Sequence, residues 1–294
     1  MKKMLVMGIV FCLLAASVGC KCLAVSTSPT TEPTAEPTLH IPTTPTPSPS
    51  PQAVVIMASS SPTSTPISTP QPTPSPEPLL LDGLIIGIDA GHQKHSNSDC
   101  EQICPDSPQT KSKVSSGTRG IQTRIYEYEV NLDVALILRD LLEASGAIVV
   151  MVRTDNDVNI SNQERAQLFN NANVDLAVRL HCNGSDDHSN RGAFMLIPDE
   201  AHTDWYNENL EAATCIIGSY CELTGLTMRG ASNGITERDD QTGFNWCNRP
   251  IVNIEMGHMT NADEDILLTD PDFQQLMARG IYDGIAEYFT KGQK

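Results

Sequence analysis

The chain has 294 residues, and 15 of its 20 prolines lie between Pro29 and Pro78, in a stretch otherwise dominated by Thr and Ser. Such a stretch buries too little apolar area to offset the entropy lost on ordering, so we expect residues 26–78 to be a disordered spacer. The remainder, 79–294, is long enough for one packed domain and too short for a second large one. That domain carries the whole net charge of −17, because residues 1–78 hold three Lys and three Glu. An acidic surface of this kind argues against nucleic acid as a partner.

The first 25 residues have the parts of an export signal. Two lysines precede an apolar run over residues 4–18, which is short for a membrane span, and small residues follow it. Ser17-Val18-Gly19-Cys20 resembles a bacterial lipobox, with Ser17 where Leu is usual. We therefore expect export from a bacterial cell, with Cys20 lipidated and the protein held at the outer face of the cytoplasmic membrane. Secretion to the cell wall without a lipid, or a retained anchor, is the alternative.

Short apolar runs alternate with helical patterns in the rest of the chain. Four runs rich in β-branched residues predict buried strands over residues 84–88, 147–152, 176–180 and 251–254. Helices are predicted over residues 130–144, after a capping box of Ser161 and Glu164, over residues 201–223, and after Asp270-Pro271. This alternation predicts a single three-layer α/β domain, with a mainly parallel twisted sheet covered by helices on both faces. Residues 93–125, rich in Ser, Gln, Lys and Gly, predict a long loop.

Polar side chains capable of chemistry follow three of the predicted strands. His92, His181 and Glu255 stand just beyond them, and Glu127 lies at the entrance to the first helix. Ligands bind at the carboxyl ends of parallel strands, so we expect these four side chains to converge. Two histidines and a carboxylate form the ligand set of a catalytic zinc ion, and a second carboxylate supplies a base. Each histidine alone could equally be a packed, hydrogen-bonded residue, and it is the convergence of all four that favours a metal.

Six blocks of sequence, spread from Leu84 to Phe289, carry a family resemblance. They are Ile88-Asp89-Ala90-Gly91-His92, Glu127-Tyr128-Glu129-Val130-Asn131-Leu132, Val152-Arg153-Thr154-Asp155, Glu164-Arg165-Ala166, Asp175-Leu176-Ala177-Val178-Arg179-Leu180-His181-Cys182-Asn183 and Val252-Asn253-Ile254-Glu255-Met256-Gly257. In order and placement they resemble the zinc-dependent N-acetylmuramoyl-L-alanine amidases of the amidase-3 type.

The resemblance implies a function and a role for each of the four side chains. His92, Glu127 and His181 would bind one zinc ion, and Glu255 would be the catalytic residue. The implied reaction is hydrolysis of the amide bond between N-acetylmuramic acid and L-alanine in peptidoglycan, by a monomer that serves cell-wall remodelling or autolysis. Two other readings remain open, a zinc hydrolase that cuts another cell-wall amide bond and a non-catalytic peptidoglycan-binding lipoprotein. The presence of all four residues argues against the second.

Other positions near these blocks carry weaker expectations. Asn183 and Arg229 are candidate substrate contacts. Glu129 is a rival ligand, but its place in the first helical turn favours a solvated residue. Cys182 follows a proposed ligand and points to the opposite strand face, so we expect burial or a disulfide rather than metal binding. His258 is either a residue that supports the metal site from behind or a polar surface residue, and we favour the surface.

The domain contains six cysteines, and export permits disulfides between them. Their spacings match no paired zinc motif and leave the pairing open. These residues are Cys100, Cys104, Cys182, Cys215, Cys221 and Cys247.

Overall fold

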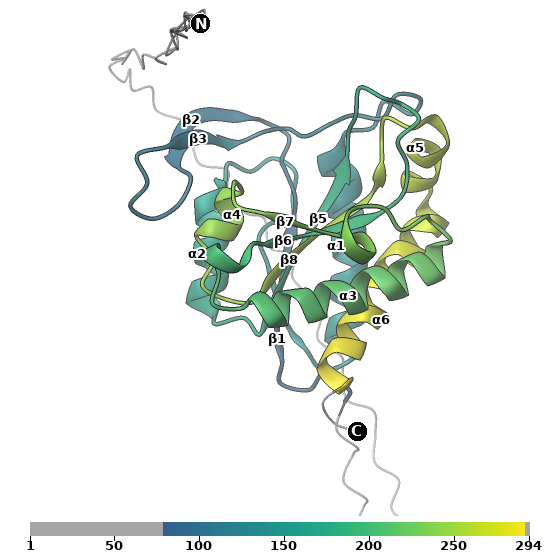
Figure 1. Cartoon of the computed structure of the whole chain (residues 1–294). Helices are drawn as coiled ribbons and strands as arrows, with labels where there is room; N and C mark the ends of the chain where they lie inside the picture. The colour runs from purple at the N-terminus through teal and green to yellow at the C-terminus, as the bar shows by residue number, and fades with distance from the viewer. Residues whose placement is uncertain (1–78, 292–294) are drawn as a thin grey trace, which may run out of the picture. The chain divides into compact units, whose positions relative to one another are not determined.

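The computed structural model describes residues 79–291 (Figure 1). The predicted export signal, the lipidation of Cys20 and the spacer over residues 26–78 therefore lie outside the described residues. Within 79–291, no helix combines the length and the apolar character needed to cross a membrane.

A six-stranded sheet forms the centre of the domain, in the order β4-β1-β5-β8-β6-β7. Its four parallel strands correspond to the four predicted runs: β1 (Ile85–Ala90), β4 (Ile148–Met151), β5 (Leu176–Asn183) and β8 (Ile251–His258). Two further strands were missed, β6 (Phe194–Pro198), which runs antiparallel to β8, and β7 (Ile235–Arg238), which runs parallel to β6. Strand β7 has only one buried residue and thus no apolar run to reveal it.

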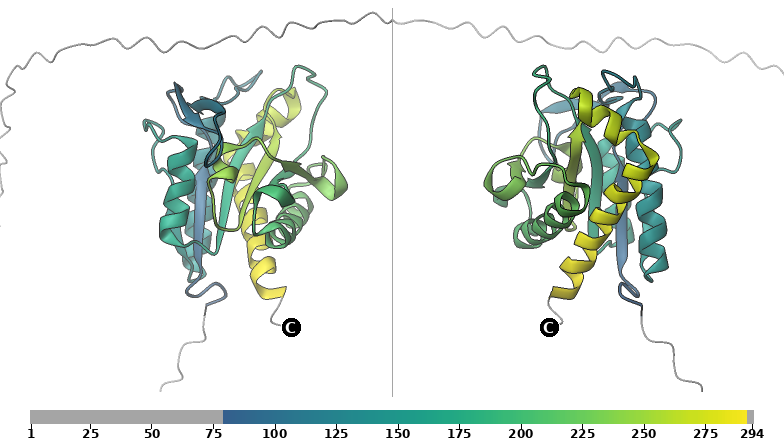
Figure 2. Two further views of the ribbon diagram at one scale, coloured as in Figure 1. Left: turned by 60° about the vertical axis from the view of Figure 1, so that its left-hand side comes forward. Right: turned by 90° about the vertical axis from the view of Figure 1, so that its right-hand side faces the viewer.

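Helices cover both faces of this sheet, which confirms the predicted three-layer α/β domain. One face packs against α1 (Glu127–Ala144), α3 (Tyr206–Thr224) and α6 (Pro271–Thr290). Helices α3 and α6 lie side by side there in both views of Figure 2. The other face packs against α2 (Asn162–Ala172) and the short α4 (Thr242–Asn245). Helix α5 (Ala262–Leu268) follows β8.

Two helices begin at the predicted capping residues, and a third begins later than predicted. Helix α2 begins with the capping box, in which Ser161 Oγ accepts from the Glu164 amide (3.2 Å) and the Glu164 carboxylate accepts from the Ser161 amide (2.8 Å). Helix α6 begins at Pro271 after an Asp270 cap. The helix predicted from residue 201 was placed too early, because the extended backbone of Thr203 separates a 3-10 turn, η1 (Glu200–His202), from α3.

The long loop predicted over residues 93–125 is wrong in part. It contains an antiparallel hairpin of β2 (Asn97–Gln102) and β3 (Thr110–Val114), which projects from the domain in Figure 1. Both strands are polar and mostly exposed, so no alternation of apolar residues signals them. Hydrogen bonds join the hairpin to the region around α4. A second 3-10 turn, η2 (Ser232–Gly234), lies between α3 and β7.

Candidate metal centre

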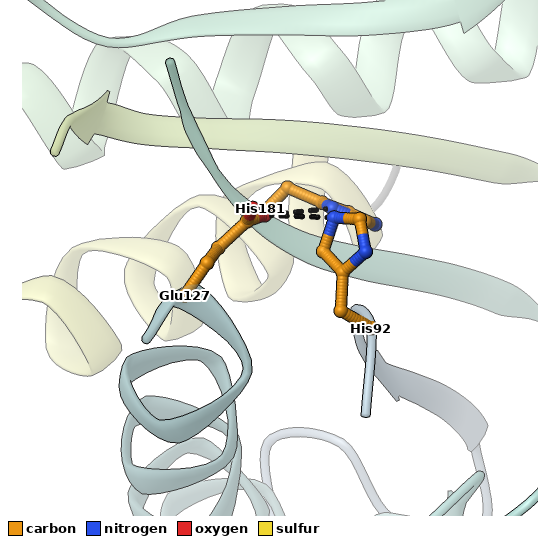
Figure 3. Close-up of side chains that lie close together, drawn as sticks. All are labelled: His92, Glu127 and His181. Carbon is orange, nitrogen blue, oxygen red and sulfur yellow. Dashed lines mark hydrogen bonds and ion pairs between the residues drawn. The ribbon is translucent and has the colours of Figure 1, made fainter. Parts of the chain in front are cut away.

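Three predicted side chains meet at the carboxyl edge of the sheet (Figure 3). His92 follows β1, Glu127 is the first residue of α1, and His181 lies near the end of β5. One nitrogen or oxygen atom from each lies within 4.8 Å of the other two. The structure thus brings together residues separated by up to 89 positions, as the strand ends led us to expect.

The carboxylate of Glu127 is the centre of this cluster. Its Oε1 lies 3.1 Å from His92 Nε2, 3.1 Å from His181 Nδ1 and accepts a hydrogen bond from the Cys182 amide (3.1 Å). Its Oε2 accepts from the amide of Thr118 (2.8 Å). Burial by itself would raise the pKa of Glu127, but the facing imidazoles outweigh burial and hold the pKa below its usual range. The carboxylate is therefore ionised and fixed in orientation.

Each imidazole places one ring nitrogen 3.1 Å from this carboxylate. His92 Nδ1 lies 3.0 Å from the carbonyl oxygen of Ser115, and in the tautomer that donates there Nε2 carries the lone pair. Burial lowers the pKa of His181 to about 4, so this ring is neutral, and its Nε2 is buried without a hydrogen-bond partner in the described part of the chain. His181 Nδ1 lies at hydrogen-bond distance from Glu127 Oε1, and the unpartnered Nε2 of the same ring is an atom that can bind a metal. Two imidazoles and one carboxylate, each with a ligand atom within 4.8 Å of the others, form a donor set that binds zinc in proteins, so the residues present fit that ion.

Two buried arginines hold the backbone loop that carries His92, which adopts a left-handed conformation with φ of 61°. Arg153 donates to the carbonyl oxygens of Ala90 (2.8 Å) and Gly91 (3.0 Å). Arg165 donates to the carbonyl oxygen of His92 itself (3.0 Å). Neither arginine was assigned a role from the sequence, although both lie in blocks of the family resemblance. These hydrogen bonds to the backbone orient His92, which is a candidate metal ligand.

A buried ion-pair network supports the same loop. Asp89 is fully buried and accepts from Arg165 Nη1 (2.6 Å) and Arg179 Nε (2.9 Å). Burial alone would raise the pKa of Asp89, but the two guanidinium groups hold it well below its usual range. The two guanidinium groups therefore keep the Asp89 carboxylate ionised, and that carboxylate in turn compensates their buried positive charge.

Glycines leave the space that the cluster needs. A Cβ on Gly91 would collide with the imidazole of His181. Gly117 has a φ of +77°, and a Cβ there would lie 2.5 Å from Glu127 Oε2 and 2.8 Å from the His92 ring. Any larger residue at either position would displace a candidate ligand.

Glu255 stands beside the cluster on β8, where it is the register partner of His181. Its Oε1 accepts a hydrogen bond from Asn253 (3.2 Å). Burial, reinforced by the negative charge of Glu127, raises the pKa of Glu255 to about 8. A dication bound nearby would act in the opposite direction. A half-buried carboxyl of this kind, with a pKa moved toward neutrality, is suited to proton transfer.

These four side chains open into a polar cavity of about 600 Å³. Asn183 is in its lining, whereas Arg229 is not. The rest of the wall comes from the loop after β5, from the segment before α1 and from the turn after β8, and it includes Thr118, Ser185, Asp186, His188 and Thr260. The cavity is large enough to hold part of a polymeric substrate.

The expectation that His258 lies on the surface is wrong. Its side chain is only 1 % exposed, and Nδ1 lies 3.0 Å from the carbonyl oxygen of Gly192. Burial and the charge of Arg229 lower the pKa of His258. The neutral ring accepts at Nε2 from Asn183 Nδ2 (3.1 Å), and Arg229 Nη1 lies 3.3 Å from the same atom. His258 thus orients Asn183, while Arg229 packs behind the cavity.

Glu129 and Cys182, the two alternative metal ligands, are not part of the cluster. Glu129 caps α1, since its Oε2 accepts from the Tyr126 amide (2.8 Å), and it is not in the cluster. Cys182 is buried as expected, and the cysteines of residues 79–291 are all unpaired.

The chain is similar to N-acetylmuramoyl-L-alanine amidases over much of the folded part. It is 28% identical over 184 residues to the germination-specific N-acetylmuramoyl-L-alanine amidase of Bacillus subtilis, a match that covers 57% of this chain and 73% of that protein. It is 29% identical over 170 residues to the amidase LytC of the same organism, covering 56% of this chain but only 32% of LytC. The crystal structure of an N-acetylmuramyl-L-alanine amidase from Mycobacterium smegmatis superposes with a TM-score of 0.65 at 26% identity, covering 73% of this chain and 99% of that one.

A protein-family model also matches most of the folded part of the sequence. The description of N-acetylmuramoyl-L-alanine amidases of the amidase-3 type fits residues 86–287, which include every candidate ligand and Glu255. The chain belongs to the amidase-3 family of N-acetylmuramoyl-L-alanine amidases.

Proposed function

We propose that this protein is an exported, zinc-dependent hydrolase that cleaves the amide bond between N-acetylmuramic acid and L-alanine in peptidoglycan. Family membership supports the reaction, and the meeting of His92, Glu127 and His181 supports the zinc ion. The observation that carries the metal is the cluster itself, in which each of the three residues has a ligand atom within 4.8 Å of the others and His181 Nε2 is buried without a hydrogen-bond partner among the described residues.

When bound, zinc supplies Lewis acidity toward a water molecule and the scissile carbonyl. Glu255 accepts the proton that the attacking water loses and returns it to the nitrogen of the leaving L-alanine. Asn253 holds the Glu255 carboxylate by its hydrogen bond to Oε1 (3.2 Å). The amide group of Asn183, fixed by His258, contacts the substrate within the larger cavity. Cys20 carries the lipid that anchors the protein, and the spacer lets the domain reach the wall.

Replacement of Glu255 separates catalysis from metal binding. Glu255→Gln keeps the size of the side chain and removes the basic carboxylate, so turnover of muropeptides should fall by about 10² to 10⁴. Zinc should stay at one ion per protein, because Glu255 is not in the ligand cluster. Muropeptide products are measured by mass spectrometry and zinc by elemental analysis.

Glu129→Gln is the matched control, because it makes the same chemical change at a residue that caps α1, and Gln also serves in a capping box. It should keep both zinc and turnover. Loss of zinc from Glu255→Gln would make Glu255 a ligand, and near-normal turnover would mean that another residue moves the proton.

A further inference from the structure

A second cavity of about 260 Å³ adjoins the candidate metal centre. It shares His92, His181 and Glu255 with the larger cavity, so the two meet at the reacting position. Its other walls come from the hairpin, from β5 and β8, and from the segments at α2 and α4. The side chains and glycine that matter here are Lys111, Asn162, Arg179, Gln241, Gly243 and Asn253.

The two cavities differ in charge. The larger cavity has Asp186 and Glu127 in its wall and, among the described residues, neither Lys nor Arg. The smaller cavity has Lys111 and Arg179. Two basic side chains in one cavity are notable in this chain, because it has 36 Asp and Glu but only 19 Lys and Arg.

Three hydrogen bonds fix the guanidinium group of Arg179 and leave some of its N–H groups unused. Nε donates to Asp89 (2.9 Å), Nη1 to Gln241 Oε1 (3.3 Å) and Nη2 to Asn162 Oδ1 (3.0 Å). A guanidinium has five N–H groups, so two of them have no acceptor within residues 79–291. A Cβ on Gly243 would lie 2.8 Å from Nη1, which means that the glycine leaves room beside the guanidinium.

Lys111 brings a second positive charge from strand β3. Its Nζ donates to the carbonyl oxygen of Asp240 (2.6 Å), and this contact fixes the side chain without neutralising it. In the part of the chain that the structure describes, no carboxylate lies within 4.0 Å of this ammonium group, which has two further donors. The Asp240 carboxylate interacts with this charge at longer range but is itself paired with Arg238 (2.7 Å), so the ammonium group keeps donors for an anionic group in the cavity.

We propose that the smaller cavity receives the peptide side of the substrate, and that Lys111 together with Arg179 binds a carboxylate on the residue that follows the scissile L-alanine. The uncharged sugar side then occupies the larger cavity. This inference rests on the proposed function, and it deepens it by giving the substrate a direction across the metal centre. Paired Arg and Lys donors bind carboxylates through short, charge-assisted hydrogen bonds.

The test compares two muropeptides that differ only in whether the second stem residue carries a free carboxylate or the corresponding carboxamide. The zinc-loaded wild-type protein should show a kcat/KM about tenfold higher for the carboxylate, mainly through a lower KM. Lys111→Met should bring the ratio of the two kcat/KM values close to one, Lys111→Arg should restore it, and Lys111→Glu should reverse it. Added salt should reduce the wild-type preference, because Lys111 is exposed.

Lys113→Met is the matched control. Lys113 lies two residues farther along β3 and pairs with Asp99 (3.6 Å), and it is not in the wall of the cavity. Its replacement should leave the ratio at the wild-type value. Equal cleavage of both muropeptides by the wild type, or a preference that survives Lys111→Met, would overturn the inference and leave the proposed function standing. Cleavage of neither muropeptide at the muramoyl amide bond would overturn both.

Discussion

The charge of Asp89 holds together the ion-pair network beneath the candidate metal centre. Asp89→Asn removes that charge and keeps the size of the side chain. The carboxylate is fully buried and pairs with Arg165 (2.6 Å) and Arg179 (2.9 Å), whose side chains are 1 % and 6 % exposed. Water therefore cannot take the place of the lost charge.

The expected loss of stability follows from these contacts. Removal of one partner of a buried ion pair costs about 3–5 kcal/mol, because the remaining charge is left uncompensated. The new amide oxygen still accepts one hydrogen bond, and Arg165 keeps its bonds to the carbonyl oxygens of Ala90 and His92 (3.2 and 3.0 Å). We therefore expect a loss near the lower end, about 3 kcal/mol. Against a total of roughly 5–15 kcal/mol, the variant stays folded but is much weaker.

Urea unfolding of the purified protein measures this loss. Trp205 and Trp246 both lie in the described domain and report unfolding by fluorescence. A chelator is present, because a metal bound to the native state would add its own stabilisation. With a slope of about 1–3 kcal/mol per M urea, the midpoint should fall by about 1 M or more.

Asp283→Asn is the control for the same chemical change at the surface. Asp283 pairs with Arg279 at a similar distance (2.7 Å), but the two side chains are 38 % and 56 % exposed. Exposed pairs contribute about 0–1 kcal/mol, so this midpoint should hardly move. Equal shifts for the two variants would refute the argument that the buried charge stabilises the fold.

The stability contributed by Asp89 should also depend on pH in a definite direction. Because the folded-state pKa of Asp89 is depressed, its contribution is fully present above the unfolded value of about 3.9 and is lost as the pH falls toward the folded pKa. The difference in unfolding free energy between wild type and Asp89→Asn should be constant from about pH 8 to pH 5 and narrow below about pH 4. A difference that stays unchanged at pH 3 would contradict this.

Two further predictions concern the metal and the anchor. The purified protein should contain about one zinc ion, and His92→Ala or His181→Ala should lose it, as measured by elemental analysis; stoichiometric zinc in both variants would exclude the site. Cys20→Ala should move the protein from the membrane fraction to the medium or wall, measured by fractionation. An unmodified mature N-terminus downstream of Cys20 in the wild type would contradict lipidation.

Much of the architecture could be predicted because its central strands are buried on both faces. Such strands are continuous apolar runs, and the polar residue that ends each run marks the edge of the sheet. His92 and His181 were found in this way, and so was Glu255. The same reasoning fails for the hairpin, whose residues Asn97–Gln102 and Thr110–Val114 are mostly exposed and have no apolar period.

Contacts between distant residues could not be predicted. Asp89 meets Arg165 and Arg179 across 76 and 90 positions of sequence, and no local pattern reports such a pair. His258 is the last residue of the buried strand β8 and was expected on the surface. The carbonyl oxygen of Gly192, 66 positions away, gives its ring a buried hydrogen-bond partner instead.

The sequence by itself determined the class of fold and the residue types at the sheet edge, because periodicity and strand ends are local properties of the chain. Only the tertiary structure decided which atoms meet. It set the imidazole nitrogens of His92 and His181 around one oxygen of Glu127, and it placed Lys111 and Arg179 in a separate cavity beside them. Distances, burial and the sign of charge in a cavity arise from segments far apart in the chain, and they exist only once those segments have packed together.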